Sequence, residues 1–358
     1  MAPIANLVLY KALRPTVSLL KLVGVWQDQP LSLCSRCVGA SIVDLLRLLM
    51  FFAAILLCTW FTANGVLPKL VLVLQSLTVT PSNMLNVSNI IFIVMSWVSV
   101  GFFFSWFLLS GKVRKFVVNN DELFKVTTPV GDIQQKRLYI VQAALIVMTV
   151  MAPCVTVLAT LASMYIVNAF NRDLLLDAIP GSVTVLLFFC LMLLINTLVY
   201  TTKLAAKSLN DTLAGRSNQD KLREKSSHEL AEFFESFCEK HALVCQVVNR
   251  LDELVGAPVT VFMVGLAANT TLALYSLLRP TTPMYGLSGD VVHMWQWVML
   301  GSSIAPLSVL AWIAGELSDE VHKTQQLIHD TLATMRVRDE KVSGGTEWLD
   351  FRCDQDVT

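Results

Sequence analysis

The residues that could perform chemistry are few in this chain, and their spacing does not form a catalytic or metal site. Cys34 and Cys37 make a C-x-x-C pair, but a structural zinc site needs four ligands and no second pair lies at a suitable spacing. Neither phosphate-loop pattern occurs, and no two histidines have the H-E-x-x-H spacing of a zinc enzyme. We therefore predict a protein that is not an enzyme and that uses no metal and no cofactor. The histidines are His228, His241, His293, His322 and His329.

Aromatic residues offer a second kind of chemistry, the binding of a small molecule. Aromatic walls with a few hydroxyl groups suit a small, partly apolar ligand. The alternative is that these rings anchor the chain, since Trp and Tyr concentrate at membrane interfaces. The candidates for a ligand pocket are Trp97, Tyr165, Phe188, Tyr275, Trp295 and Trp297.

Two amides, Asn196 and Asn269, lie within long apolar stretches. A polar side chain in a membrane helix usually faces the bundle and finds a partner there. We expect both to be buried, and Asn196 is either a contact that joins two helices or part of a site.

The elements that must position these residues are membrane helices. The chain is 54% hydrophobic and only 15% charged, with a mean hydropathy of +0.60, whereas about a quarter of the residues in a soluble domain are charged. Each charge-free interval is at least as long as the ~20 residues that a helix needs to cross the bilayer. A β-barrel would instead show alternating strands of about ten residues. The intervals are 48–68, 70–111, 138–171, 178–202, 254–278 and 291–315.

The fold class that follows is an all-α, polytopic membrane helix bundle with six transmembrane helices. Of the 27 basic residues, all but Lys69, Arg172 and Arg279 fall in alternate connecting segments. Because Lys and Arg are retained in the cytoplasm, we predict that both termini are cytoplasmic, in a multi-pass plasma-membrane protein. The sequon at Asn86 then lies in an exterior loop and is a glycosylation candidate.

The same reasoning divides the chain into five parts. The lipid bilayer surrounds two of them, and we expect no nucleic-acid partner. The parts are a cytoplasmic N-terminal segment (1–44), transmembrane helices one to four (45–202), a cytoplasmic helical extension (203–255), transmembrane helices five and six (256–315) and a cytoplasmic C-terminal helix and tail (316–358).

The extension carries a narrow apolar stripe on a charged helix. Its apolar residues recur at steps of three and four, which is the spacing of a helix that packs against protein along one seam. The helix enters the fifth membrane segment with only Gly256 and Pro258 at the junction. We predict a long helix that leaves the membrane and packs against protein in the cytoplasm. The candidates for this oligomer stripe are Leu230, Phe234, Phe237, Val244, Val248 and Leu251.

Two stretches resemble the arthropod gustatory receptors, a family of chemoreceptor channels. "LRPTVSLLKLVGVW" resembles the N-terminal signature of that family. "HALVCQVVNRLDELVGAPVTVFMVGLAANTTLALYSLL" resembles its fifth helix, and the matching positions are Leu243, Val247, Asn249, Leu254 and Tyr275.

The resemblance implies a ligand-gated, poorly selective cation channel with seven helices in each of four subunits. The subunits are joined through cytoplasmic extensions of the fourth to seventh helices, the seventh lines the pore, and a tastant-like small molecule enters a pocket in the outer half. The family's seventh-helix signature, Thr-Tyr followed by apolar residues and Gln-Phe, does not appear after Glu316. We therefore expect a truncated subunit, in a homo- or hetero-oligomer, that does not conduct alone. The alternative is a six-helix carrier or an accessory subunit of a receptor channel.

Overall fold

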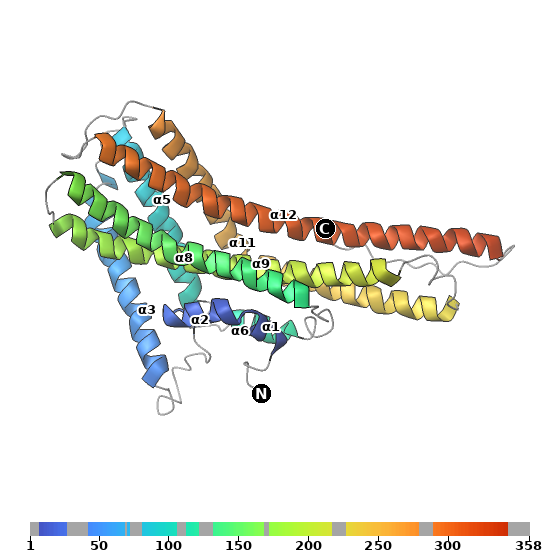
Figure 1. Cartoon of the computed structure of the whole chain (residues 1–358). Helices are drawn as coiled ribbons and strands as arrows, with labels where there is room; N and C mark the ends of the chain where they lie inside the picture. The colour runs from blue at the N-terminus through green and yellow to red at the C-terminus, as the bar shows by residue number, and fades with distance from the viewer. Residues whose placement is uncertain are drawn as a thin grey trace.

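The computed structural model describes residues 7–26, 42–68, 70–71, 81–105, 112–121, 132–167, 172–216, 227–278 and 289–342, and every element in these ranges is helical (Figure 1). The helices near the N-terminus are short, and those toward the C-terminus are long. They are α1 (Val8–Ala12), α2 (Arg14–Leu22), α3 (Ile42–Trp60) with the π-helical turn η2 (Phe61–Val66), α5 (Pro81–Phe102), α6 (Lys112–Asn119), α8 (Asp132–Val167), α9 (Arg172–Arg216), α11 (Ser227–Leu277) and α12 (Gly289–Val342).

Six of these helices are long and apolar enough to cross a membrane, which confirms the predicted class of a polytopic helical membrane protein. The polar stretch before the fifth span and the polar stretch after the sixth continue as helix, in α11 and α12. The helical ranges that contain these candidate spans, the last three of which also include part of the polar stretches, are Leu45–Asn64, Val87–Ser105, Lys136–Tyr165, Ile179–Thr212, Glu235–Leu277 and His293–Asp330.

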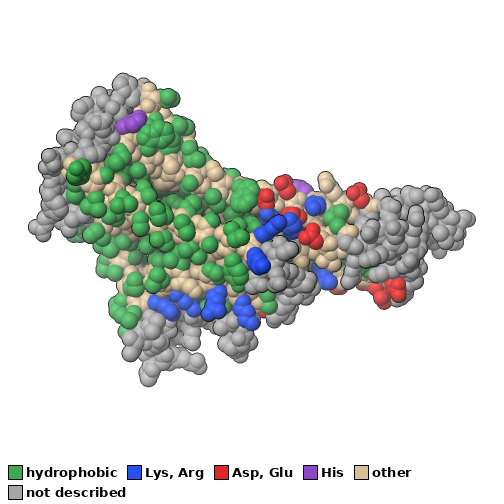
Figure 2. Space-filling view, in the orientation of Figure 1, with side chains coloured by type: hydrophobic (Ala, Val, Ile, Leu, Met, Phe, Trp, Pro, Cys, Tyr) green, Lys and Arg blue, Asp and Glu red, His purple; other side chains and the backbone are tan. Residues whose placement is uncertain are grey.

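The turn end is the end where α8 is followed by α9 and α11 is followed by α12. The extension comprises residues 203–216 of α9, 227–253 of α11 and 316–342 of α12, which run side by side away from the bundle in Figure 1. Hydrophobic side chains cover the bundle in Figure 2, whereas charged ones gather over the extension.

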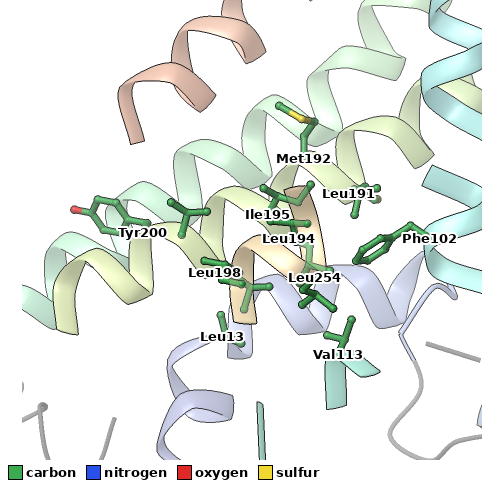
Figure 3. Close-up of a cluster of buried hydrophobic side chains, with 14 of the residues drawn as sticks. Leu13, Phe102, Val113, Leu191, Met192, Leu194, Ile195, Leu198, Tyr200 and Leu254 are labelled. Atoms are coloured by element: carbon green, nitrogen blue, oxygen red, sulfur yellow. The ribbon is translucent and has the colours of Figure 1, made fainter. Parts of the chain in front are cut away.

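Helix α9 is the centre of the bundle. In an 18-residue apolar stretch of its span 83% of the residues are buried, against 17% in the corresponding stretch of α3 and 22% in that of α8. A helix that is apolar on all sides belongs in such a position, and every side chain from Leu187 to Leu198 is at most 2% exposed. Figure 3 shows Leu194 and Leu198 of α9 beside Leu254 of α11 in the buried cluster.

The two N-terminal helices belong to the core. Leu9, Leu13 and Leu20 are buried at steps of four and seven residues, so α1 and α2 present one apolar face to the bundle. Thr16 Oγ1 lies 3.1 Å from Thr197 Oγ1 of α9, and both groups are buried. The segment predicted to precede the first transmembrane helix therefore packs against the bundle, in contact with α9.

Gly24 is required where α2 turns toward α3. Its φ is +87°, and a Cβ there would lie 2.5 Å from the backbone oxygen of Arg47. Because an L side chain costs about 1–2 kcal/mol in this conformation and the clash adds to it, Gly24→Ala should lower the free energy of unfolding by about 2 kcal/mol. Unfolding by SDS in mixed micelles measures this change.

Gly101→Ala is the matched control. Gly101 lies in α5, and nothing lies within 4 Å of the position of an added Cβ. Alanine there should be neutral or stabilising by up to about 1 kcal/mol, since it favours helix. Equal losses at the two glycines would contradict the account of the α2–α3 turn.

Candidate ligand-binding site

Phe188 lies at the point where α5, α9 and α11 meet. Its ring is fully buried and makes edge contacts with Phe92, at 6.2 Å between centroids, and with Phe262, at 5.0 Å. These are favourable aromatic geometries. The structure therefore uses Phe188 as core packing that fixes three helices relative to one another.

The other aromatic candidates do not line a common pocket. Tyr165 is 84% exposed, near the end of α8, and Trp297 is also exposed. Trp97 sits at an edge and donates from Nε1 to Thr62 Oγ1 at 3.0 Å, whereas Tyr275 is half-buried on α11. Exposed Trp and Tyr side chains in these places suit anchoring in the membrane interface.

Trp295 is the candidate that joins two helices at the turn end. Its Nε1 donates to Ser163 Oγ at 3.0 Å, from α12 to α8. Trp295→Phe keeps the ring's bulk and removes this hydrogen bond, so we expect a loss of about 0.6–1 kcal/mol in the free energy of unfolding. SDS titration of the purified chain measures it.

Trp297→Phe is the paired control. Trp297 Nε1 donates to His293 Nε2 at 3.1 Å, one turn away on the same exposed helix face. Its loss should change the stability of the bundle by less than about 0.3 kcal/mol, because exposed groups find other partners readily. An equal effect of both substitutions would contradict the role given to Trp295.

Asn269 is a buried amide without a hydrogen-bond partner. It is 0% exposed, and neither its Nδ2 nor its Oδ1 has a partner among the described residues. Such an orphaned group costs about 1–3 kcal/mol, and in a native structure it calls for an explanation. A ligand that supplies the missing donor and acceptor is one explanation.

Contacts of neighbouring residues place this part of α11 beside α5, and α5 beside α12. One turn before Asn269, a Cβ on Gly265 would lie 2.8 Å from Met95 Sδ, so α11 and α5 touch there. Because these helices are antiparallel, the next turn of α11 is level with Ser88, which is buried and donates to Met299 Sδ of α12 at 3.7 Å.

Two further polar side chains lie at this level. Gln296 of α12 is buried one turn before Leu300, and its Oε1 has no partner among the described residues. Ser182 of α9 is buried two turns from Phe188, on the side toward the turn end. The register of the helices places four buried polar side chains near the turn end, and we call Ser88, Ser182, Asn269 and Gln296 together the turn-end polar cluster.

The turn-end polar cluster can donate and accept hydrogen bonds, but it has no charged side chain that could form an ion pair with a ligand. Amides and hydroxyls supply both donors and acceptors, and the stretches 178–202, 254–278 and 291–315 hold no charged residue. The chemistry that fits is an uncharged molecule with polar groups and an apolar body.

Asn196 is a second orphaned amide, in the other half of the bundle. It too is 0% exposed, and both of its amide atoms lack a partner in the described part of the chain. Helices α9 and α12 are parallel, and residues that form hydrogen bonds between them differ in number by 110 (Asn210 with Glu320) to 114 (Asn210 with Thr324). Asn196 is therefore level with residues 306–310 of α12, well away from the turn end.

A polar clamp joins α9 to α12 where the extension begins. Asn210 Nδ2 donates to the backbone oxygen of Glu320 at 2.8 Å and to its Oε2 at 3.0 Å, and Thr324 Oγ1 donates to Asn210 Oδ1 at 2.6 Å. Nearer the bundle, Lys203 forms an ion pair with Glu316. These bonds fix the register of the two helices.

The apolar stripe of α11 is used within the chain. Phe237, Val244 and Leu251 are at most 3% exposed and Val248 is half-buried, so a second copy would have to contact other residues of the extension. The side chains of Leu230 and Phe234 lie outside those described, as does that of Asn86 on α5.

Sequence reasoning missed Ser88, Ser182 and Gln296. Gln296 carries a signal, because it stands four and seven residues before Leu300 and Ser303 on the face that is buried along α12. Nothing in the sequence alone distinguishes the two serines from those that bond their own helix.

The comparisons with known proteins give no relative. No protein-family profile matches the chain, and no curated protein sequence matches it.

Proposed function

We propose that the chain is a ligand-binding subunit of a chemosensory receptor channel of the gustatory-receptor type, in the plasma membrane. Its ligand is a small uncharged molecule that satisfies Asn269 and Gln296 in the turn-end polar cluster. The channel is a poorly selective cation channel built from several copies or from this chain with related subunits.

The observation that carries this proposal is the continuity of α9, α11 and α12. Each runs without interruption from the turn-end polar cluster into the extension, and the clamp at Asn210 ties two of them together. A ligand that shifts the packing at the turn end therefore displaces the far ends of the same helices, because packed helices move as rigid elements.

The orientation puts the turn end outside and the extension in the cytoplasm. Basic residues support this arrangement, since the turn end carries only two of them: Arg172, the first residue of α9, and Arg279, between α11 and α12. Lys and Arg are retained on the cytoplasmic side. A site near the turn end is then open to molecules that arrive from outside the cell.

A binding screen tests the ligand. The purified full chain in lipid nanodiscs is heated with a panel of uncharged small molecules, including sugars, polyols, amides and alkaloids. A ligand at a hundred times its Kd stabilises by about 2.7 kcal/mol, so we expect at least one compound to raise the Tm by several degrees. A panel with no active compound would contradict the proposal.

A transport assay distinguishes a receptor from a carrier. Vesicles containing the chain are incubated with the radiolabelled form of the active compound, and its uptake is compared with that of empty vesicles. A receptor gives equal uptake in both. Accumulation that depends on the chain would instead show a carrier and overturn the proposal.

Electrical recording tests the channel. We expect that cells expressing the chain together with a full-length gustatory-receptor subunit give a cation current that needs both this chain and the active compound. A current with the same size and ligand dependence in cells that lack this chain would contradict its place in the channel.

A further inference from the structure

The surface around α1, α2 and α6 is strongly basic. Residues 7–26 and 112–120 contain no acidic residue, and Asp121, which follows, is buried and accepts a hydrogen bond from the backbone N–H of Leu9. Within the described part of the chain, exposed Arg14 and Lys115 have no ion-pair partner. The basic belt consists of Lys11, Arg14, Lys21, Lys112, Lys115, Lys136 and Arg137.

The level of the basic belt is fixed by contacts with three membrane spans. Gly24, just beyond α2, packs on the backbone of Arg47, two residues into the span of α3. Gln142 Nε2, near the start of the α8 span, donates to the backbone oxygen of Ala12 at 2.8 Å. Thr16 meets Thr197, five residues before the charge-free part of α9 ends. The short helices therefore lie where the apolar spans stop.

The surface next to the basic belt is suited to lipid tails. Leu45, Leu46 and Leu49 of α3 are 53–56% exposed, and Leu22 at the end of α2 is 71% exposed. Figure 2 shows Lys and Arg side chains in a row along the lower edge of the apolar surface. Cations directly above apolar side chains match a phospholipid, with its phosphate at the surface and its tails below.

We propose that the basic belt binds the headgroups of anionic phospholipids in the adjacent leaflet. In the orientation given above this leaflet is cytoplasmic, which is where anionic lipids concentrate. Binding of these headgroups holds the chain at a fixed depth in the membrane. Because α2 packs on α8 and α9, the lipid composition of this leaflet also affects the packing of the bundle.

Native mass spectrometry of the full chain in detergent tests the proposal. The chain is titrated with phosphatidylserine or with phosphatidylcholine, and we expect phosphatidylserine to bind more tightly. Each cation contributes about fivefold, so Arg14→Gln/Lys115→Gln should weaken phosphatidylserine binding roughly 25-fold and leave phosphatidylcholine binding unchanged. The charge-conserving Arg14→Lys/Lys115→Arg variant should keep the preference.

Lys240→Gln/Lys323→Gln is the matched control, because it removes two basic side chains from the extension and should not change lipid binding. Equal affinity of the unmodified chain for the two lipids would overturn the proposal without any variant. Equal losses in Arg14→Gln/Lys115→Gln and in the control would overturn it as well, since the net charge of the chain would then explain the preference.

Discussion

Replacing Phe188 with alanine is expected to lower the free energy of unfolding by about 4 kcal/mol. Phe-to-Ala changes in a packed core cost about 3–5 kcal/mol through lost burial and the cavity left behind. Phe188 is fully buried, and its edge contacts with Phe92 and Phe262 add an aromatic term. SDS titration in mixed micelles gives the difference from the unmodified chain.

Tyr165→Ala is the control for this large effect. Tyr165 is the most exposed of the aromatic ligand candidates, at 84%, so its removal should change the stability by less than about 0.5 kcal/mol. A cost at Phe188 as small as that at Tyr165 would mean that α5, α9 and α11 do not meet at this ring.

Replacing Asn210 with alanine is expected to cost about 3 kcal/mol. The substitution removes three hydrogen bonds to Glu320 and Thr324, one of which reaches the Glu320 carboxylate. Hydrogen bonds to charged groups are worth about 1.5–3 kcal/mol, and the groups left behind lose their partner. The same unfolding titration measures this cost.

A double-mutant cycle isolates the clamp from general damage. Asn210→Ala and Thr324→Val, combined, should cost at least about 1 kcal/mol less than the sum of the two single changes, because the pair shares one bond. Asn249→Ala, at an exposed position of α11, should be silent. Strict additivity of the two changes would contradict a direct contact between α9 and α12 at this level.

Composition and periodicity were sufficient to predict the class of fold. Charge-free intervals of span length can only be helices, because lipid offers no partner for backbone groups. Six such intervals predict six spans, and the described part of the chain has six helices long and apolar enough to cross a membrane. The length of a span and its lack of charge depend only on the local sequence, so they can be predicted without knowing which helices are neighbours.

The site could not be predicted in the same way, because it depends on which helices are neighbours. Ser88 and Met299 are 211 positions apart, and their contact links α5 to the part of α12 that carries Gln296. The aromatic candidates were chosen by residue type, and type does not distinguish buried Phe188 from exposed Tyr165. Likewise, the spacing of the α11 stripe predicts a packed face but not that its partner is the same chain.

The most direct test of the account compares Asn269→Leu with Asn196→Leu. Both asparagines are 0% exposed and both have orphaned amides in the described structure, so each substitution removes a buried unpaired group. We expect each variant to unfold at a slightly higher temperature than the unmodified chain. Only Asn269→Leu should lose the rise in Tm that the active compound of the screen produces. If Asn269→Leu keeps that rise, or if Asn196→Leu loses it, the ligand does not bind at the turn-end polar cluster.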